Sequence, residues 1–469
     1  MNTTSELAAL ASASLAVALT LGLAACGGGG DEASNQASAA PLDAQRATAL
    51  ALRKPPPPPP PAPAPDATLV LASANASGQA ALGDVCAVSA DGGKVLFTST
   101  SANLVSGDVN GRADLFLKNF NGNGVTLVAQ AGAIFSVVCL GMTADGNSVV
   151  YIANVFTGGE ILPGVGSSEA AIMLKNLTTG QLTRVTPPLN TFPNVDSYQF
   201  AGISDDGLRV AFIAQPTRSC SGFDCTATGP ARMLLRELST GQLVNLESQV
   251  RISTSQGVAD GDAWLSPNGR SLAFSSSAAY PEAGDTTPKS DVYALDIASG
   301  TVRLVNTDAA GRQITIAGTV SPTYGVQSFL SNSSKLAFFT DYDTSAGPAG
   351  VYVKDLVSGA LDRVLDRNLT YSIGNHAALS FSDDGRKVAY VQSTGNTLTG
   401  SSVARVRDLV TGTVVNAATL SNGTVGNGRT TTAALLSRDG RAAAFANDAT
   451  NLVAGASTAE VRAYRKLLP

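Results

Sequence analysis

The fold is decided by the stretch Leu265-Ser266-Pro267-Asn268-Gly269-Arg270-Ser271-Leu272-Ala273-Phe274-Ser275, which returns as Phe381-Ser382-Asp383-Asp384-Gly385-Arg386-Lys387-Val388-Ala389-Tyr390-Val391. Asp or Asn followed by Gly favours a tight turn with positive φ, so each copy predicts a hairpin between two β-strands. Four further copies and one degenerate copy bring the total to seven: Ser89-Ala90-Asp91-Gly92, Thr143-Ala144-Asp145-Gly146, Ser204-Asp205-Asp206-Gly207, Ser437-Arg438-Asp439-Gly440 and Ser331-Asn332-Ser333-Ser334.

A second phrase follows each turn after a variable gap. Its clearest copy is Asp291-Val292-Tyr293-Ala294-Leu295-Asp296-Ile297-Ala298-Ser299-Gly300, and its relatives run over 114–120, 171–177, 232–238, 350–356, 403–409 and 460–466. The closing Ser/Thr-Gly marks another hairpin, so each unit should contain four antiparallel strands, a to d. One such sheet cannot bury both of its faces, but seven arranged radially bury one another. The sequence therefore predicts an all-β, seven-bladed β-propeller over residues 67–469.

The spacing of the turns predicts how the ring closes. Only 30 residues follow Asp439, too few for a complete blade, and 25 residues separate Asp66 from Asp91. Together these two pieces make one normal repeat. We therefore expect the N-terminal strand 68–72 to pair with strand 460–466 and complete the last blade.

The two phrases resemble the WD-like repeats of the TolB family of propellers. The resemblance covers residues 67–469 and is specific for the fold rather than for a function. TolB itself carries an additional α/β domain before its propeller, whereas the residues before 67 read here as a leader and a tether. The resemblance thus implies a TolB-like propeller that is distinct from TolB.

The N-terminal residues have the pattern of a targeting signal. An apolar run from Leu7 ends in Leu23-Ala24-Ala25-Cys26, and glycines follow. This pattern resembles the bacterial lipobox and predicts a lipoprotein signal peptide over 1–25, with Cys26 lipidated. The region before the run departs from the usual signal-peptide pattern because it has no Lys or Arg. A simple transmembrane anchor is the alternative, since the apolar run is nearly long enough to span a bilayer. Residues 26–66, with their proline stretch, are expected to form a disordered, Pro-rich tether. Because Gly27 follows the cysteine, we expect an outer-membrane lipoprotein facing the periplasm or the cell surface.

Composition excludes some classes of function. Charged residues are 14% of the chain and the net charge is -5, so a nucleic-acid partner is not expected. The chain has one histidine and no G-x-S-x-G, H-E-x-x-H, P-loop or C-x-x-C motif. Oligogalacturonate lyases share this type of propeller but use several histidines at a metal site.

We expect a monomeric, non-catalytic binding or scaffolding protein without a cofactor, whose partner is an envelope protein, peptide or glycan. The alternative is a hydrolase or lyase that acts on an envelope or extracellular polysaccharide with carboxylates at the channel mouth.

One loop loosely resembles a calcium loop. Asp108, Asn110 and Asp114 place oxygen atoms at positions 1, 3 and 7, and Asp285 and Asp291 have the same separation as the two aspartates. The terminal bidentate glutamate of an EF-hand is missing. We therefore favour hydrogen bonds from loop backbone to Asp114 and Asp291, and calcium is the alternative.

Four cysteines lie in the predicted propeller. Cys220 and Cys225 fit a small closed loop between strands b and c of blade three. Cys86 and Cys139 lie in strand a of blades one and two, five and six residues before their turn aspartates. This offset gives them opposite strand parity, so their side chains can face each other between the blades. We predict disulfides 86–139 and 220–225, and the alternative is two buried free thiols at 86 and 139.

The loop lengths predict a binding face. The a–b and c–d turns share one face and are short, whereas the b–c and d–a loops share the other and are long: 101–112, 154–169, 187–199, 215–230, 278–290 and 308–325. Elaborated loops on a rigid scaffold usually carry function. Aromatic residues precede several a strands near this rim, and one histidine lies close to them: Phe135, Tyr198, Tyr324, Tyr371 and His376. They are expected to form a stacking surface for a glycan or extended peptide, unless they only pack the loops.

Overall fold

The computed structural model describes residues 66–122, 124–131, 137–154, 170–221, 224–229, 231–250, 263–287, 290–315, 324–329, 334–340, 343–366, 379–394, 401–431, 433–453 and 458–469. The predicted signal peptide, Cys26 and all of the tether except Asp66 lie outside these ranges. The strands belong to one compact unit, Ala62–Pro469. Within the described ranges, no helix is long and apolar enough to cross a membrane.

The described strands form seven four-stranded antiparallel sheets, which confirms the predicted seven-bladed propeller. Blade one contains β2 (Asp84–Val88), β3 (Lys94–Ser99), β4 (Asp114–Asn119) and β5 (Gly124–Ala129); blade two β6 (Val138–Met142), β7 (Ser148–Asn154), β8 (Ala170–Asn176) and β9 (Leu182–Arg184); blade three β10 (Val195–Ile203), β11 (Arg209–Pro216), β14 (Arg232–Glu237) and β15 (Leu243–Asn245); blade four β16 (Ala263–Leu265), β17 (Ser271–Ser276), β18 (Asp291–Asp296) and β19 (Thr301–Leu304); blade five β20 (Tyr324–Phe329), β21 (Lys335–Thr340), β22 (Gly350–Asp355) and β23 (Leu361–Asp366); blade six β24 (Ser380–Phe381), β25 (Lys387–Thr394), β26 (Ser401–Asp408) and β27 (Val414–Asn416); and blade seven β28 (Leu435–Leu436), β29 (Ala442–Asn447), β30 (Arg462–Leu467) and β1 (Leu69–Leu71).

Three short elements lie in the loops between the blade strands. The hairpin β12 (Arg218–Ser221) and β13 (Asp224–Ala227) lies between strands b and c of blade three. Two single 3₁₀ turns, η1 (Leu189–Thr191) and η2 (Pro281–Ala283), lie before β10 and β18. All three lie in b–c or d–a loops, on the face opposite the short turns.

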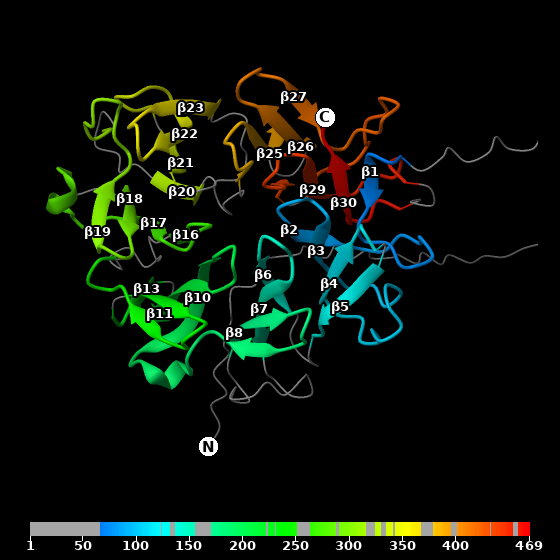
Figure 1. The fold of residues 1–469 in the computed structure, drawn as a ribbon, viewed down its shortest axis with the longest axis horizontal. Coiled ribbons are helices and arrows are strands. Elements are labelled where there is room, and N and C mark those ends of the chain that lie inside the picture. The colour runs from blue at the N-terminus through cyan, green and yellow to red at the C-terminus, as the bar shows by residue number, and fades with distance from the viewer. Residues whose placement is uncertain are drawn as a thin grey trace, which may run out of the picture. The chain divides into compact units, whose positions relative to one another are not determined.

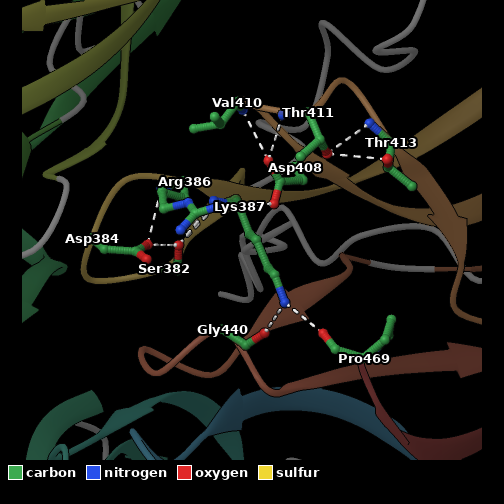
Figure 2. Close-up of polar contacts among 10 residues, drawn as sticks. All are labelled: Ser382, Asp384, Arg386, Lys387, Asp408, Val410, Thr411, Thr413, Gly440 and Pro469. Carbon is green, nitrogen blue, oxygen red and sulfur yellow. Dashed lines mark hydrogen bonds and ion pairs between the residues drawn. The ribbon is translucent and has the colours of Figure 1, made fainter.

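The repeated turn owes its geometry to its serine and aspartate, as Figure 2 shows for blade six. The hydroxyl of Ser382 donates to Asp384 at 2.6 Å and accepts the backbone N–H of Lys387 at 2.9 Å. Gly385 has a φ of 65°, a region that residues with a Cβ rarely adopt. Because these bonds are local, the motif folds into the same hairpin wherever it occurs.

A cation at the start of strand b often joins one blade to the next. The ammonium of Lys387 donates to the Gly440 carbonyl and to a main-chain oxygen of Pro469, each at 3.0 Å (Figure 2). In blade three, Arg209 donates to the Gly269 carbonyl of blade four at 2.8 Å. These bonds pair a charged donor with a neighbouring turn and so fix how adjacent blades are spaced.

The ring closes as predicted. β1 pairs with β30 in antiparallel register, Leu69 opposite Lys466 and Leu71 opposite Tyr464, and Figure 1 shows blue β1 beside red β30. Leu69 and Leu71 are buried in an apolar cluster shared by blades six and seven. The N-terminal strand therefore supplies both hydrogen bonds and core to the last blade.

The core lies between neighbouring blades and inside each sheet. Strands b and c of four blades carry aromatic pairs in direct register, with ring centroids 5.4–5.8 Å apart: Phe97 with Phe116, Phe274 with Tyr293, Phe338 with Tyr352 and Phe445 with Tyr464. Such offset stacks add to the burial of their area. The repeated sequence thus builds a repeated core.

Candidate functional site

The second residue of each repeated turn lies at the inner end of its blade in the six blades whose turns the structure describes. Backbone hydrogen bonds join these positions between adjacent blades: Ala90 N–H donates to the Ala144 carbonyl at 2.8 Å, Asp205 N–H to Pro267 at 2.7 Å, and Asp383 N–H to Arg438 at 2.6 Å. Strand a is the innermost strand of a propeller blade. The residues at this position therefore surround the channel mouth on the short-turn face.

Three of these residues are charged and meet at the mouth. Arg438 of blade seven forms an ion pair and hydrogen bond with Asp205 of blade three, although the two blades are not neighbours. Burial raises the pKa of Asp205, and Arg438 partly offsets this effect. Oδ1 of Asp205 is buried, and no described residue donates a hydrogen bond to it. The mouth thus holds a carboxylate tied to a guanidinium across the channel.

Asp383 adds a second carboxylate to this cluster. Burial raises its pKa, Arg438 lowers it and Asp205 raises it further. Its side chain is exposed, however, so water screens these charges. The cluster of Asp205, Asp383 and Arg438 is the feature that the alternative enzyme hypothesis requires at the channel mouth.

Sequence reasoning did not single out these three residues. They occupy the one variable position of an otherwise repeated motif, filled by Ala90, Ala144, Asp205, Pro267, Asn332, Asp383 and Arg438. Three charged residues among seven is a high share in a chain with 14% charged residues. Comparing the repeats with one another would have revealed the cluster.

The long-loop face carries a groove of about 390 Å³ between blades seven and one. Residues 75–77 after β1, residues 102–106 between β3 and β4, and Val125 on β5 line it. The side-chain amide of Asn75 donates to the carbonyl of Asn103 at 3.2 Å and so joins its two walls. Amides, hydroxyls and small apolar groups make up the lining, which includes no charged side chain.

Only two of the five residues predicted to form the stacking surface lie within the described ranges. Tyr198 lies inside β10, is 8% exposed and packs edge-on against Phe212 with ring centroids 5.5 Å apart. It is a core residue and not part of an open stacking surface. Tyr324 is the first residue of β20, and its backbone pairs with Thr340. The remaining three residues lie outside the described ranges: Phe135, Tyr371 and His376.

The loop of blade one that resembles a calcium loop is hydrogen-bonded in part. Oδ1 of Asp114 accepts the Ala131 N–H at 2.6 Å and the Asn110 amide at 3.2 Å. Oδ1 of Asp108 accepts the Asn110 N–H at 3.4 Å. The second oxygen of each aspartate is buried without a hydrogen-bond partner among the described residues. The favoured backbone interaction is therefore present at Asp114, but it accounts for only one of its oxygens.

The matching aspartates of blade four are bonded more completely. Asp285 accepts hydrogen bonds from Thr287 N–H at 2.9 Å and from the Tyr293 hydroxyl at 2.9 Å. Asp291 accepts the amide of Asn306 at 2.6 Å rather than a backbone N–H. In the part of the chain that the structure describes, no group of three or more His, Cys, Asp or Glu side chains could hold a metal.

The cysteines lie where the sequence placed them. Cys86 and Cys139 form a disulfide between strand a of blade one and strand a of blade two, with Cα atoms 6.2 Å apart. Cys220 and Cys225 stand directly opposite each other in the β12–β13 hairpin. The bridge between this second pair stays a prediction.

No protein-family model matches this chain, and a search of curated proteins found no match. Solved structures do resemble it. Oligogalacturonate lyase from Vibrio parahaemolyticus is 12% identical with a TM-score of 0.51, and the alignment covers 85% of this chain and 91% of that one. An oligogalacturonate lyase in complex with manganese is 14% identical with a TM-score of 0.50, covering 86% of this chain and 90% of that one.

TolB from Acinetobacter baumannii is also similar, at 14% identity and a TM-score of 0.38, with 76% of each chain covered. At these identities the comparisons establish a shared β-propeller fold, and the fold by itself hosts both enzymes and binding proteins.

Proposed function

We propose that this chain is a non-catalytic binding propeller of the bacterial envelope, anchored through a lipidated Cys26. Its long-loop face would bind a neutral glycan or an extended peptide. The observation that carries the proposal is the uncharged groove formed by residues 75–77 and 102–106. Amides and hydroxyls beside apolar surface can hydrogen-bond and pack against such a ligand without burying an unpaired charge.

The charge cluster at the opposite mouth also supports binding rather than catalysis. Arg438 of blade seven holds Asp205 of blade three in an ion pair. The pair bridges two blades and so suits a structural role.

Capture experiments with single added charges test the binding face. Ala102 is exposed in the groove and Val357 is 85% exposed in the c–d turn of blade five, on the opposite face. The chain without residues 1–26, immobilised, should capture a component from separated glycan and protein pools of its own envelope. Ala102→Arg should abolish capture, whereas Val357→Arg should retain it. Equal capture by both variants would place the partner elsewhere.

One observation favours the alternative, a hydrolase or lyase acting on an envelope or extracellular polysaccharide. Burial raises the pKa of Asp205, and its Oδ1 lacks a partner among the described residues; raised carboxyl pKa values are common at catalytic sites. This hypothesis predicts new reducing ends or unsaturated sugars when the chain is incubated with the glycan pool. Asp205→Asn should then abolish product formation. An unchanged glycan pool would reject the alternative.

A further inference from the structure

We propose that the loop between β3 and β4 of blade one is a calcium site whose protein ligands include Asp108 and Asp114. This inference is independent of the proposed binding function. It rests on two buried carboxylates, each with an oxygen that accepts no hydrogen bond from the described residues, and on a comparison with the start of strand c in two other blades.

The two carboxylates are deeply buried and incompletely bonded. Asp108 is 2% exposed and Asp114 is fully buried. Oδ2 of each is inaccessible to solvent and receives no hydrogen bond from any residue that the structure describes. A buried carboxylate without a compensating partner is strongly unfavourable, and two side by side add mutual repulsion. The pair therefore requires a positive charge or a shared proton.

Asn110 joins the two carboxyl groups. Its N–H donates to Asp108 Oδ1 at 3.4 Å, and its side-chain amide donates to Asp114 Oδ1 at 3.2 Å. The two carboxyl groups therefore lie on opposite sides of one residue. A divalent cation between them would remove both penalties at once.

Blade four shows the same pair with its oxygens satisfied. Asp285 and Asp291 are separated by six residues, like Asp108 and Asp114, and Asp291 also begins strand c. The side-chain amide of Gln313 lies between them and donates to Asp285 Oδ1 at 3.1 Å and to Asp291 Oδ2 at 3.0 Å. In this blade an amide group occupies the place between the carboxylates.

The aromatic residue two positions into strand c explains part of the difference. In blade four the hydroxyl of Tyr293 donates to Asp285 Oδ2 at 2.9 Å. Blade one has Phe116 at the corresponding position, and its ring lacks a donor. Asp108 therefore lacks the hydrogen bond that Asp285 receives from Tyr293.

Blade seven has an arginine at the first position of strand c, where blade one has Asp114. Arg462 is the first residue of strand c and pairs with Asn447, as Asp114 pairs with Ser99 in blade one. Its side chain is 4% exposed and donates to Thr458 and Glu460 oxygens. Blade seven thus has a guanidinium in the place of the strand-c aspartate, blade four has an amide between its two aspartates, and for blade one we infer a bound cation between the two.

The donor chemistry selects calcium among common cations. Carboxylate oxygens are hard ligands, and Ca²⁺ completes its shell with backbone carbonyls, amide oxygens and water in flexible geometry. Neither histidine nor cysteine occurs between residues 100 and 131, so the soft ligands preferred by zinc and copper are missing from the loop sequence.

The test is calcium-dependent stability of the chain without residues 1–26. After treatment with EGTA, adding CaCl2 should raise the melting temperature, and calorimetry should find binding to one site. Asp108→Asn and Asp114→Asn should each abolish the shift. Asp291→Asn in blade four is the matched control and should leave the calcium-induced shift intact.

Phe116→Tyr is a second, constructive variant. It supplies the hydroxyl that blade four has, so it should raise the melting temperature in EGTA and shrink the calcium-induced shift. Should Asp114→Asn fail to fold, Asp108→Asn and Phe116→Tyr decide the question. An identical melting temperature of the wild type in EGTA and in CaCl2 would overturn the proposal in favour of a shared proton. A shift that survives Asp108→Asn would also overturn it.

Discussion

Replacing Leu71 with alanine should weaken ring closure by removing core that only β1 supplies. Leu71 is 8% exposed and packs in the apolar cluster between blades six and seven. Buried Leu→Ala substitutions cost about 2–5 kcal/mol, depending on how far the cavity collapses. Total stabilities are about 5–15 kcal/mol, so this loss is a large fraction of the whole.

Val70 provides the matched control within the same strand. Its side chain is half-buried and points to the opposite side of β1. Val70→Ala should cost less, under about 1.5 kcal/mol, because fewer buried contacts are lost. The hydrogen bonds between β1 and β30 are the same in both variants, so the comparison isolates the side chain.

Urea unfolding monitored by tryptophan fluorescence measures this effect. The chain has a single tryptophan, Trp264, which lies on β16 in blade four and therefore reports on a blade distant from β1. If the closed ring unfolds cooperatively, Leu71→Ala should move the Trp264 transition to lower urea. Equal midpoints for Leu71→Ala and Val70→Ala would refute the idea that β1 holds the ring closed.

Three further predictions concern other parts of the chain. Cys26→Ser should move the protein from the membrane fraction to the soluble fraction, and unchanged fractionation would reject the lipid anchor. Cys139→Ser should remove the bridge to Cys86, which links residues 53 apart, and should lower the free energy of unfolding by about 2–5 kcal/mol; non-reducing mass spectrometry that finds both thiols free in the wild type would contradict the bridge. The Ser89 hydroxyl and the Gly93 N–H lower the pKa of Asp91, so its carboxylate stabilises the fold above pH 3.8 and this contribution is lost as the pH falls through the lowered pKa. Asp91→Asn should therefore cost stability at pH 7 and progressively less in acid, whereas a cost independent of pH would argue against this linkage.

The local chemistry of the turns explains why the fold could be predicted. A serine, an aspartate and a glycine make the hairpin with bonds that span five residues or fewer, so the motif is visible in the sequence. Closure by β1 followed from the incomplete last repeat, because an unpaired sheet edge is unfavourable. Strand parity predicted that Cys86 and Cys139 face each other, and in the structure each cysteine lies at an irregularity in the pairing of its strand.

The candidate site could be predicted only in part. Arg438 and Asp205 are 233 residues apart, and their contact depends on how the blades are arranged around the channel. Tyr198 was expected before strand a, but β10 begins at Val195, so the tyrosine lies within the strand and its ring enters the core. Strand boundaries depend on pairing with the neighbouring strand, which a single repeat does not reveal.

The loop of blade one illustrates a different limit. Asp108 and Asp114 have the sequence spacing of calcium ligands, and the same spacing suits carboxylates that accept hydrogen bonds from the loop backbone. Only the hydrogen bonds of the folded loop distinguish these two roles. Each carboxylate has one oxygen without a partner among the described residues. Phe116 is the residue that distinguishes this loop from that of blade four. In the sequence alone, it looks like any other buried aromatic residue of a strand c.

We propose that the partner binds the long-loop face at the groove beside β1. Hydrogen–deuterium exchange of the chain, alone and with the captured envelope component, tests it most directly. We predict slower exchange in residues 75–79 and 102–106 on binding, with the short-turn segments 204–208 and 437–441 unchanged. Protection of those turn segments, without protection of the groove, would contradict the claim and direct attention to the mouth formed by Asp205 and Arg438.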